Sequence, residues 1–156
     1  MRSDISIRTA TLEDLPVLLH HRREMFEAMG YVDPAVHKPL ESLTVEYFQD
    51  GFRQGTFHAW LAVDPAGTVV GGGGVAEMAL PPGPFSPTLM RPEILNVYVE
   101  PAYRRQGIAR RLMEVMIGWC RARGFGSVFL HASDEGRPLY ASMGFEPTPE
   151  MRLVIK

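Results

Sequence analysis

The sequence predicts one mixed α/β (α+β) domain with its elements in the order β-α-α-β-β-β-α-β-α-β. The chain has 156 residues, 46% hydrophobic and 22% charged, which fits one domain with a buried core. Stretches with an apolar residue at every second position are interleaved with stretches that follow the helical period. No linker, repeat or change of composition divides the chain, so we expect a single domain over residues 1–156.

The N-terminal part is expected to form one strand and two helices. Residues 5–8 alternate as in a strand. Thr11, followed three residues later by Asp14, resembles a helix start. Residues 33–39 predict a loop, after which a second helix ends at Gly55. The helical period of the first helix continues to Gly30 through Leu15, Leu18, Leu19, Arg22, Met25, Phe26 and Met29.

An antiparallel hairpin and a further strand form the predicted middle of the chain. Residues 56–63 and 68–80 predict two strands that are joined by a turn. The glycine run Gly71–Gly74 indicates a bulge or the close approach of another backbone. The proline-rich stretch 81–92 predicts a loop, and the next strand is expected over residues 93–99.

The C-terminal part contains the most amphipathic helix, predicted over residues 107–123. A strand is expected at 127–132, a short helix at 137–142 and a last strand at 152–155. The apolar face of the long helix carries Ile108, Leu112, Val115, Met116, Trp119 and Cys120.

Composition argues against several classes of protein. No stretch approaches the roughly 18–20 apolar residues of a membrane span, and the first residues lack the apolar centre of a signal peptide. Cys120 is the single cysteine, so no internal disulfide can form, and no paired histidine spacing suggests a metal. We therefore expect a soluble cytoplasmic protein with no membrane partner and no metal.

The positive charge is concentrated in one segment. Six of the 14 arginines fall between Arg104 and Arg123, where Glu114 is the only acid, so this segment carries +5 and the remainder carries -7. A basic segment in an acidic protein suggests one anionic ligand at one place, whereas a solvated helix face is the alternative. The near-neutral total of -2 argues against a nucleic-acid binder.

The turn Arg104–Ala109 begins the long helix. The first backbone N–H groups of a helix have no partner within it and carry the positive end of its dipole. Gly107 has no side chain and Ala109 is small, so an anion can approach the backbone closely. The turn therefore predicts a phosphate or pyrophosphate site, with an ordinary glycine turn as the alternative.

Two motifs carry a resemblance to a known family. Residues 97–109 (Val-Tyr-Val-Glu-Pro-Ala-Tyr-Arg-Arg-Gln-Gly-Ile-Ala) closely resemble the acetyl-CoA-binding motif of the GCN5-related N-acetyltransferase (GNAT) superfamily, Arg/Gln-x-x-Gly-x-Gly/Ala. Residues 139–145 resemble its Leu-Tyr-x-x-x-Gly-Phe element. The order and separation of the motifs also match. The resemblance implies a mostly antiparallel central sheet, flanked by helices, with a V-shaped splay between its fourth and fifth strands.

The resemblance implies acetyl-CoA as cosubstrate. The backbone of residues 105–109 would hold its pyrophosphate, and residues 97–99 would pair with its pantetheine arm as an added strand does. Ser133 replaces an asparagine, and Gly136 an alanine, that are common in the family. The residues expected to bind the cosubstrate are Val97, Tyr98, Val99, Arg104, Arg105, Gln106, Gly107, Ile108, Ala109, Ser133 and Tyr140.

Three residues are candidates for the catalytic roles. Tyr140 matches the family's usual general acid, since a phenol with a pKa of about 10 can protonate a thiolate. Glu93 resembles the catalytic glutamate of the histone-acetyltransferase branch. Asn96 would order a water or bind substrate, although alternation along the strand opposes it to Glu93 unless a bulge intervenes. Packing for the tyrosine and exposure to solvent for the glutamate are the alternatives.

The expected activity is direct transfer of an acyl group to a primary amine of a small molecule or peptide. The acidic remainder of the chain mildly suits a cationic amine. In this family the first helix often lines the acceptor site, but for its polar residues 20–24 we favour a solvated face. A non-catalytic sensor or interaction module that binds CoA is the alternative function. Many relatives are dimers, so a homodimer remains an option.

Overall fold

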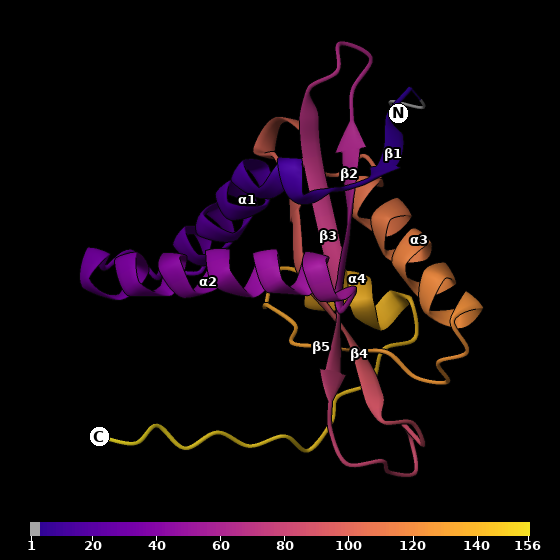
Figure 1. The fold of residues 1–156 in the computed structure, drawn as a ribbon. Helices are drawn as coiled ribbons and strands as arrows, with labels where there is room; N and C mark the ends of the chain where they lie inside the picture. Colours follow the sequence, from indigo (N-terminus) through magenta and orange to yellow (C-terminus); the bar gives the residue numbers. More distant parts are fainter. Residues whose placement is uncertain (1–3) are drawn as a thin grey trace.

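A five-stranded sheet with the strand order β1-β2-β3-β4-β5 forms the centre of the protein (Figure 1). The computed structural model describes residues 4–156, and residues 1–3 of the expected domain lie outside them. Neighbouring strands are antiparallel except β4 and β5, which are parallel, so the mixed, mostly antiparallel sheet is confirmed. The strands are β1 (Ser6–Thr9), β2 (Phe57–Val63), β3 (Val69–Ala79), β4 (Met90–Val99) and β5 (Phe129–Leu130).

Helices cover both faces of the sheet (Figure 1). On one face Leu18 and Phe48 pack against apolar residues of β2 and β3, and on the other Leu112 and Met116 pack against residues of β2–β4. Cys120 lies in the second of these cores, where burial raises the pKa of its thiol to about 11. The helices are α1 (Leu15–Ala28), α2 (Pro34–Gln54), α3 (Ile108–Ala122) and α4 (Arg137–Ser142), with short 3-10 turns η1 (Leu12–Asp14) and η2 (Pro101–Tyr103). Within residues 4–156, none of the helices combines the length and the apolar character that a membrane crossing needs.

The glycines of β3 allow helix α3 and strand β4 to come close to this strand. A Cβ atom on Gly73 would stand 2.7 Å from Cε of Met116 on α3, and one on Gly71 would stand 2.8 Å from the backbone O of Tyr98 on β4. The register between β3 and β4 also shifts within the run. Both the close approach and the bulge that the sequence predicts are therefore confirmed.

The predicted loop at residues 33–39 is wrong, because α2 begins at Pro34. The Asp33 side chain accepts a hydrogen bond from Ala35 N–H (3.0 Å), which caps the helix. Pro34 fits the first turn, where no N–H donor is needed. Pro39 lies inside the helix and leaves the Ala35 carbonyl without its usual N–H donor, which is why its sequence resembles a loop.

The strands near the C-terminus differ most from expectation. β4 begins at Met90 rather than residue 93, because residues 90–92 also pair with β3. β5 has two residues instead of the predicted 127–132, since it pairs with β4 at only two positions. The predicted strand at 152–155 is wrong: this segment leaves the body of the protein as an extended tail with no adjacent strand among the described residues (Figure 1). Without a partner strand, no ladder of hydrogen bonds forms.

Candidate active site

β4 and β5 separate soon after they pair. Their pairing is restricted to Glu93 with Phe129 and Ile94 with Leu130. Beyond it a cleft of about 910 Å³ opens between the end of β4 and the segment that follows β5, as the V-shaped splay predicts. The cleft brings together ten of the predicted cofactor-binding residues: Val97, Tyr98, Val99, Arg104, Arg105, Gly107, Ile108, Ala109, Ser133 and Tyr140.

The turn before α3 presents free backbone donors to this cleft. Arg105 and Gly107 both have left-handed backbones, with φ of 59° and 80°, and together they bend the chain into the helix. The first helical hydrogen bond runs from Arg111 N–H to Gly107 O (3.1 Å). The N–H groups of residues 108–110 therefore precede the helical ladder, at the positive end of a 15-residue helix. This geometry suits an anion.

The arginines of the basic segment do not all lie at the cleft. Arg104, Arg105 and Arg110 line it, whereas Arg123 lies at the far end of α3, 3.0 Å from Glu77 Oε1. Arg104 donates from Nε to Val99 O (2.9 Å), which ties the turn to β4. The prediction that the +5 charge lies at one place is thus wrong. Part of this charge lies at the cleft, and part lies at the far end of α3.

Gln106 is the one expected cofactor residue that does not line the cleft. Its Nε2 is turned back toward Ala102 O, at 3.5 Å. The Ser133 hydroxyl lines the cleft and accepts a hydrogen bond from Gly136 N–H (3.1 Å). This bond orients the segment that leads into α4.

Tyr140 lies on α4, at the wall of the cleft. Burial raises the pKa of its phenol, so the side chain is protonated at neutral pH. Its ring packs edge-on against Phe145, with centroids 6.0 Å apart. Arg110 Nη2 donates to Ser142 Oγ (2.6 Å), which connects α3 to α4. Tyr140 is thus protonated and is held by packing against Phe145.

A bulge in β4 turns Asn96 away from the cleft. Two β4 residues, at 96 and 97, stand opposite one β3 residue, and Asn96 has a left-handed φ of 62°. Its Nδ2 donates to Leu18 O (3.2 Å) on α1, and the side chain is 1% exposed. The bulge reverses the alternation, so Asn96 points to the same side of the sheet as Glu93. Asn96 is therefore not part of the cleft wall, and its bond to Leu18 O holds α1 against β4.

Glu93 is neither solvated nor part of the cleft wall. It is 7% exposed, and its Oε1 lies 2.6 Å from His131 Nδ1. His131 Nε2 lies 2.5 Å from Glu150 Oε2. Burial alone would lower the pKa of His131, but its hydrogen bond to Glu150 and the charge of Glu93 raise it. The nearest partner of the Glu93 carboxylate is therefore the His131 imidazole, whose own pKa is raised.

The polar residues of α1 are not the solvated face that we favour from the sequence. His21 is fully buried, and within residues 4–156 neither ring nitrogen has a hydrogen-bond partner. Burial, together with the charge of His20, lowers the pKa of His21 to about 4. His20 Nε2 lies 2.8 Å from Glu100 Oε1, at the end of β4. His21 therefore belongs to the interior, whereas Arg23 on the same turn is exposed.

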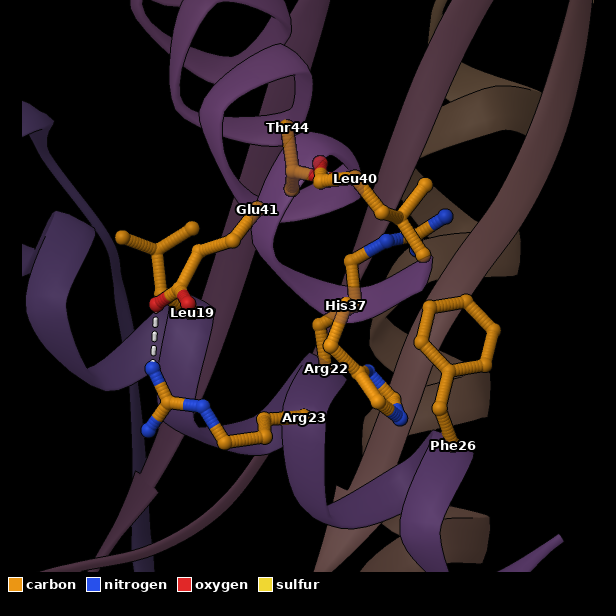
Figure 2. A pocket seen from close by; sticks show the side chains of 8 residues that line it. All are labelled: Leu19, Arg22, Arg23, Phe26, His37, Leu40, Glu41 and Thr44. Carbon is orange, nitrogen blue, oxygen red and sulfur yellow. Dashed lines mark hydrogen bonds and ion pairs between the residues drawn. The ribbon is translucent and has the colours of Figure 1, made fainter. Parts of the chain in front are cut away.

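Sequence reasoning assigned no role to a second, smaller cavity between α1 and α2. This cavity has a volume of about 30 Å³, and Figure 2 shows the side chains of both helices that line it. One signal was present in the sequence, because Arg22 occupies an apolar position of the helical period of α1. The lining residues are Leu19, Arg22, Arg23, Phe26, His37, Leu40, Glu41 and Thr44.

A sheet that opens beside the N-terminus of an amphipathic helix, with a protonated tyrosine in the same cleft, defines a transferase that takes an elongated anionic cosubstrate. The model of the acetyltransferase (GNAT) family matches residues 17–145. The chain therefore belongs to this family, and it is an acyltransferase of the N-acetyltransferase type.

Individual relatives resemble the chain over most of its length. An uncharacterized N-acetyltransferase of Escherichia coli (strain K12), YjgM, is 29% identical over 143 residues, which are 90% of this chain and 81% of that protein. A GCN5-related N-acetyltransferase from Ralstonia eutropha JMP134 superposes with a TM-score of 0.90 and 31% identity, covering 97% of this chain and 98% of that one. A predicted acetyltransferase from Clostridium acetobutylicum, solved with acetyl-CoA, has a TM-score of 0.86 and 24% identity, covering 97% and 96%.

Proposed function

We propose that the protein transfers an acetyl group from acetyl-CoA to a primary amine of a small molecule or peptide, directly and in a ternary complex. The observation that carries this is the cleft, which joins the free N–H groups of the α3 turn to Tyr140 along Val97–Val99. The Clostridium acetobutylicum structure, which has the same fold, contains acetyl-CoA. A pyrophosphate would accept hydrogen bonds from the turn, and pantetheine would pair with the end of β4.

The chemistry that we propose in the cleft needs an acid, and it needs an acceptor for one proton. The amine nitrogen attacks the thioester carbonyl carbon, a C–N bond forms, and the C–S bond then breaks. A backbone N–H of residues 97–99 polarises the carbonyl oxygen. Tyr140 gives its proton to the departing sulfur, so that CoA leaves as the thiol.

The proton lost by the amine is proposed to reach Glu93 through water. Glu93 lies on β4 below the bulge but outside the cleft wall, so it does not touch the amine directly. His131, at 2.6 Å, holds the carboxylate in place. Glu93 therefore acts at a distance, as the terminal acceptor of a short water path.

The deciding measurement is thiol release from acetyl-CoA across a panel of amines, combined with calorimetric titration of CoA. We expect CoA binding and turnover on at least one amine, and absence of CoA binding would overturn the proposal. Glu93→Gln should lower the rate. Glu77→Gln is the matched control, because Glu77 is an ion-paired carboxylate on the neighbouring strand, beside Arg123 of α3.

A non-catalytic sensor that binds CoA is the second candidate, favoured by the positioning of Asn96 and Glu93 outside the cleft wall. It predicts acyl-CoA binding without turnover on any amine. We also propose a cytoplasmic location, because the buried free thiol of Cys120 fits a reducing compartment. A homodimer is the oligomeric state that we propose.

A further inference from the structure

Arg22 is a half-buried cation with no hydrogen-bond or ion-pair partner in the described part of the chain. Its Nε is buried without a hydrogen bond, and no carboxylate lies within ion-pair distance of its guanidinium. Its one close partner is the ring of Phe26, 5.0 Å from the guanidinium carbon. Arginine stays charged in proteins, and a desolvated charge without a counterion is costly. Arg22 therefore carries a positive charge that no acid of the described residues pairs with, and an anion can bind to it.

The cavity beside Arg22 can take a small anion. Leu19, Leu40 and Phe26 supply apolar walls, as Figure 2 shows, and such walls strengthen any charge interaction inside them. The neighbouring Arg23 is already paired with Glu41. These two charges cancel, so Arg22 leaves the cavity with one net positive charge. A volume of about 30 Å³ and a single charge match a carboxylate better than a phosphate group.

The cavity lies on the same face of the sheet as the Glu93 side chain. Tyr47 is on α2, one turn beyond the cavity residue Thr44. Burial and the charge of Glu93 raise the pKa of Tyr47, while the charge of Arg22 lowers it, so its phenol feels both groups. Helix α1 also separates the two spaces: Arg22 faces the cavity, and Met25 lines the large cleft. Arg22 and Met25 are three residues apart on α1, so the cavity and the cleft are neighbours across this helix.

We propose that the acceptor is an amine that also carries a carboxylate, and that Arg22 binds this carboxylate in the α1–α2 cavity. The inference rests on the proposed acetyl transfer and names the class of its acceptor. The planar guanidinium can donate two parallel hydrogen bonds to the carboxylate. This fixes the far end of the acceptor, so that its amine is held toward the cleft. Arg22 is a specificity-determining residue.

The test uses unbranched amino carboxylic acids of increasing length, each against its own carboxamide. We expect the best acid to exceed its carboxamide about tenfold in kcat/KM. In Arg22→Gln the acid and its carboxamide should have about the same kcat/KM, chiefly because KM for the acid rises. Arg22→Lys keeps the charge without the planar fork and should give an intermediate ratio. Arg53→Gln removes the same charge from a surface ion pair on α2 and should leave the ratio intact.

The outcomes separate the inference from the proposed function. Equal use of acids and carboxamides, or a preference that survives in Arg22→Gln, would overturn the role of Arg22 while acetyl transfer stands. If no amine is acetylated, acetate and acetamide are titrated instead at constant ionic strength, following the Arg22 Nε–H resonance by NMR. A shift with acetate alone supports the site, and no shift overturns it. Loss of CoA binding bears on the proposed function only.

Discussion

Tyr140 rests directly on the backbone of Gly136. A Cβ atom added to Gly136 would stand 2.8 Å from Tyr140 Cε2 and 3.1 Å from its hydroxyl. We predict that Gly136→Ala displaces the Tyr140 ring, and that kcat falls about tenfold or more while acetyl-CoA affinity changes little. Steady-state kinetics with calorimetry test this. Gly118→Ala is the control, because the added Cβ there meets no atom within 4 Å apart from its chain neighbours and the adjacent backbone of α3, and it should stabilise α3 by up to about 1 kcal/mol.

Removal of the Tyr140 hydroxyl alone tests its chemical role. Tyr140→Phe keeps the ring and its packing on Phe145, so we expect the free energy of unfolding to stay nearly constant. The rate of thiol release should fall about 100-fold, because the proton donor is lost. An unchanged kcat would show that another group protonates the sulfur.

Gly107 tests the anion site at the turn. Its φ of 80° suits glycine, so alanine or any larger residue costs about 1–2 kcal/mol of strain. Gly107→Glu adds a negative charge beside the free N–H groups, and we expect CoA binding to be lost. Gly107→Ala shares the strain but not the charge, and it should retain measurable binding by calorimetry. If both variants bind CoA as the wild type does, the turn is not the pyrophosphate site.

The buried His21 predicts acid sensitivity. Its pKa is lowered to about 4 by burial, whereas an unfolded histidine titrates near pH 6.5. Between these values the unfolded chain binds the extra proton, so stability falls as the pH is lowered from about 6.5 to 4, by about 3 kcal/mol in total. Urea unfolding at a series of pH values measures this. The same curve for His21→Leu should be flatter across that window, and equal slopes would contradict the assignment.

The tail predicts self-association. Leu153 and Ile155 are 85% and 89% exposed on an extended segment, and β5 offers an open sheet edge. Unpaired apolar strands and open edges tend to pair with one another. We expect a concentration-dependent dimer by light scattering, weakened by the double change Leu153→Asp with Ile155→Asp. A monomer at all concentrations in the wild type would rule out the homodimer.

Local signals predicted much of this fold. The amphipathic period predicted α3, and the glycine run predicted the close approach of another backbone to β3; the structure has both where expected. The start of α2 was missed because Pro39 reads as a helix breaker, although the Asp33 cap outweighs it. The strand at 152–155 has a strand-like sequence, but pairing depends on a neighbour that no local pattern supplies.

The candidate site was predictable in its backbone more than in its side chains. The glycine and helix start at residue 107 lie where the sequence suggested. Asn96 was misplaced because one extra residue in β4 reverses every expected direction beyond it. Arg22 was overlooked because only its tertiary surroundings show that no acid is available to it. The acidic remainder of the chain suggested a cationic acceptor, whereas the single positive charge of Arg22 favours an acceptor that also carries an acidic group.

Helix α1 contributes side chains to both the small cavity and the large cleft, and the side chains on its two sides can be substituted separately. Arg22 and Met25 are less than one turn apart, yet one faces the small cavity and the other the large cleft. For enzyme engineering, the first position offers a means to exchange the acceptor, and the second to widen the space for a longer acyl chain. Asn96 anchors the same helix through Leu18 O, and a library that varies the two positions should keep this anchor fixed.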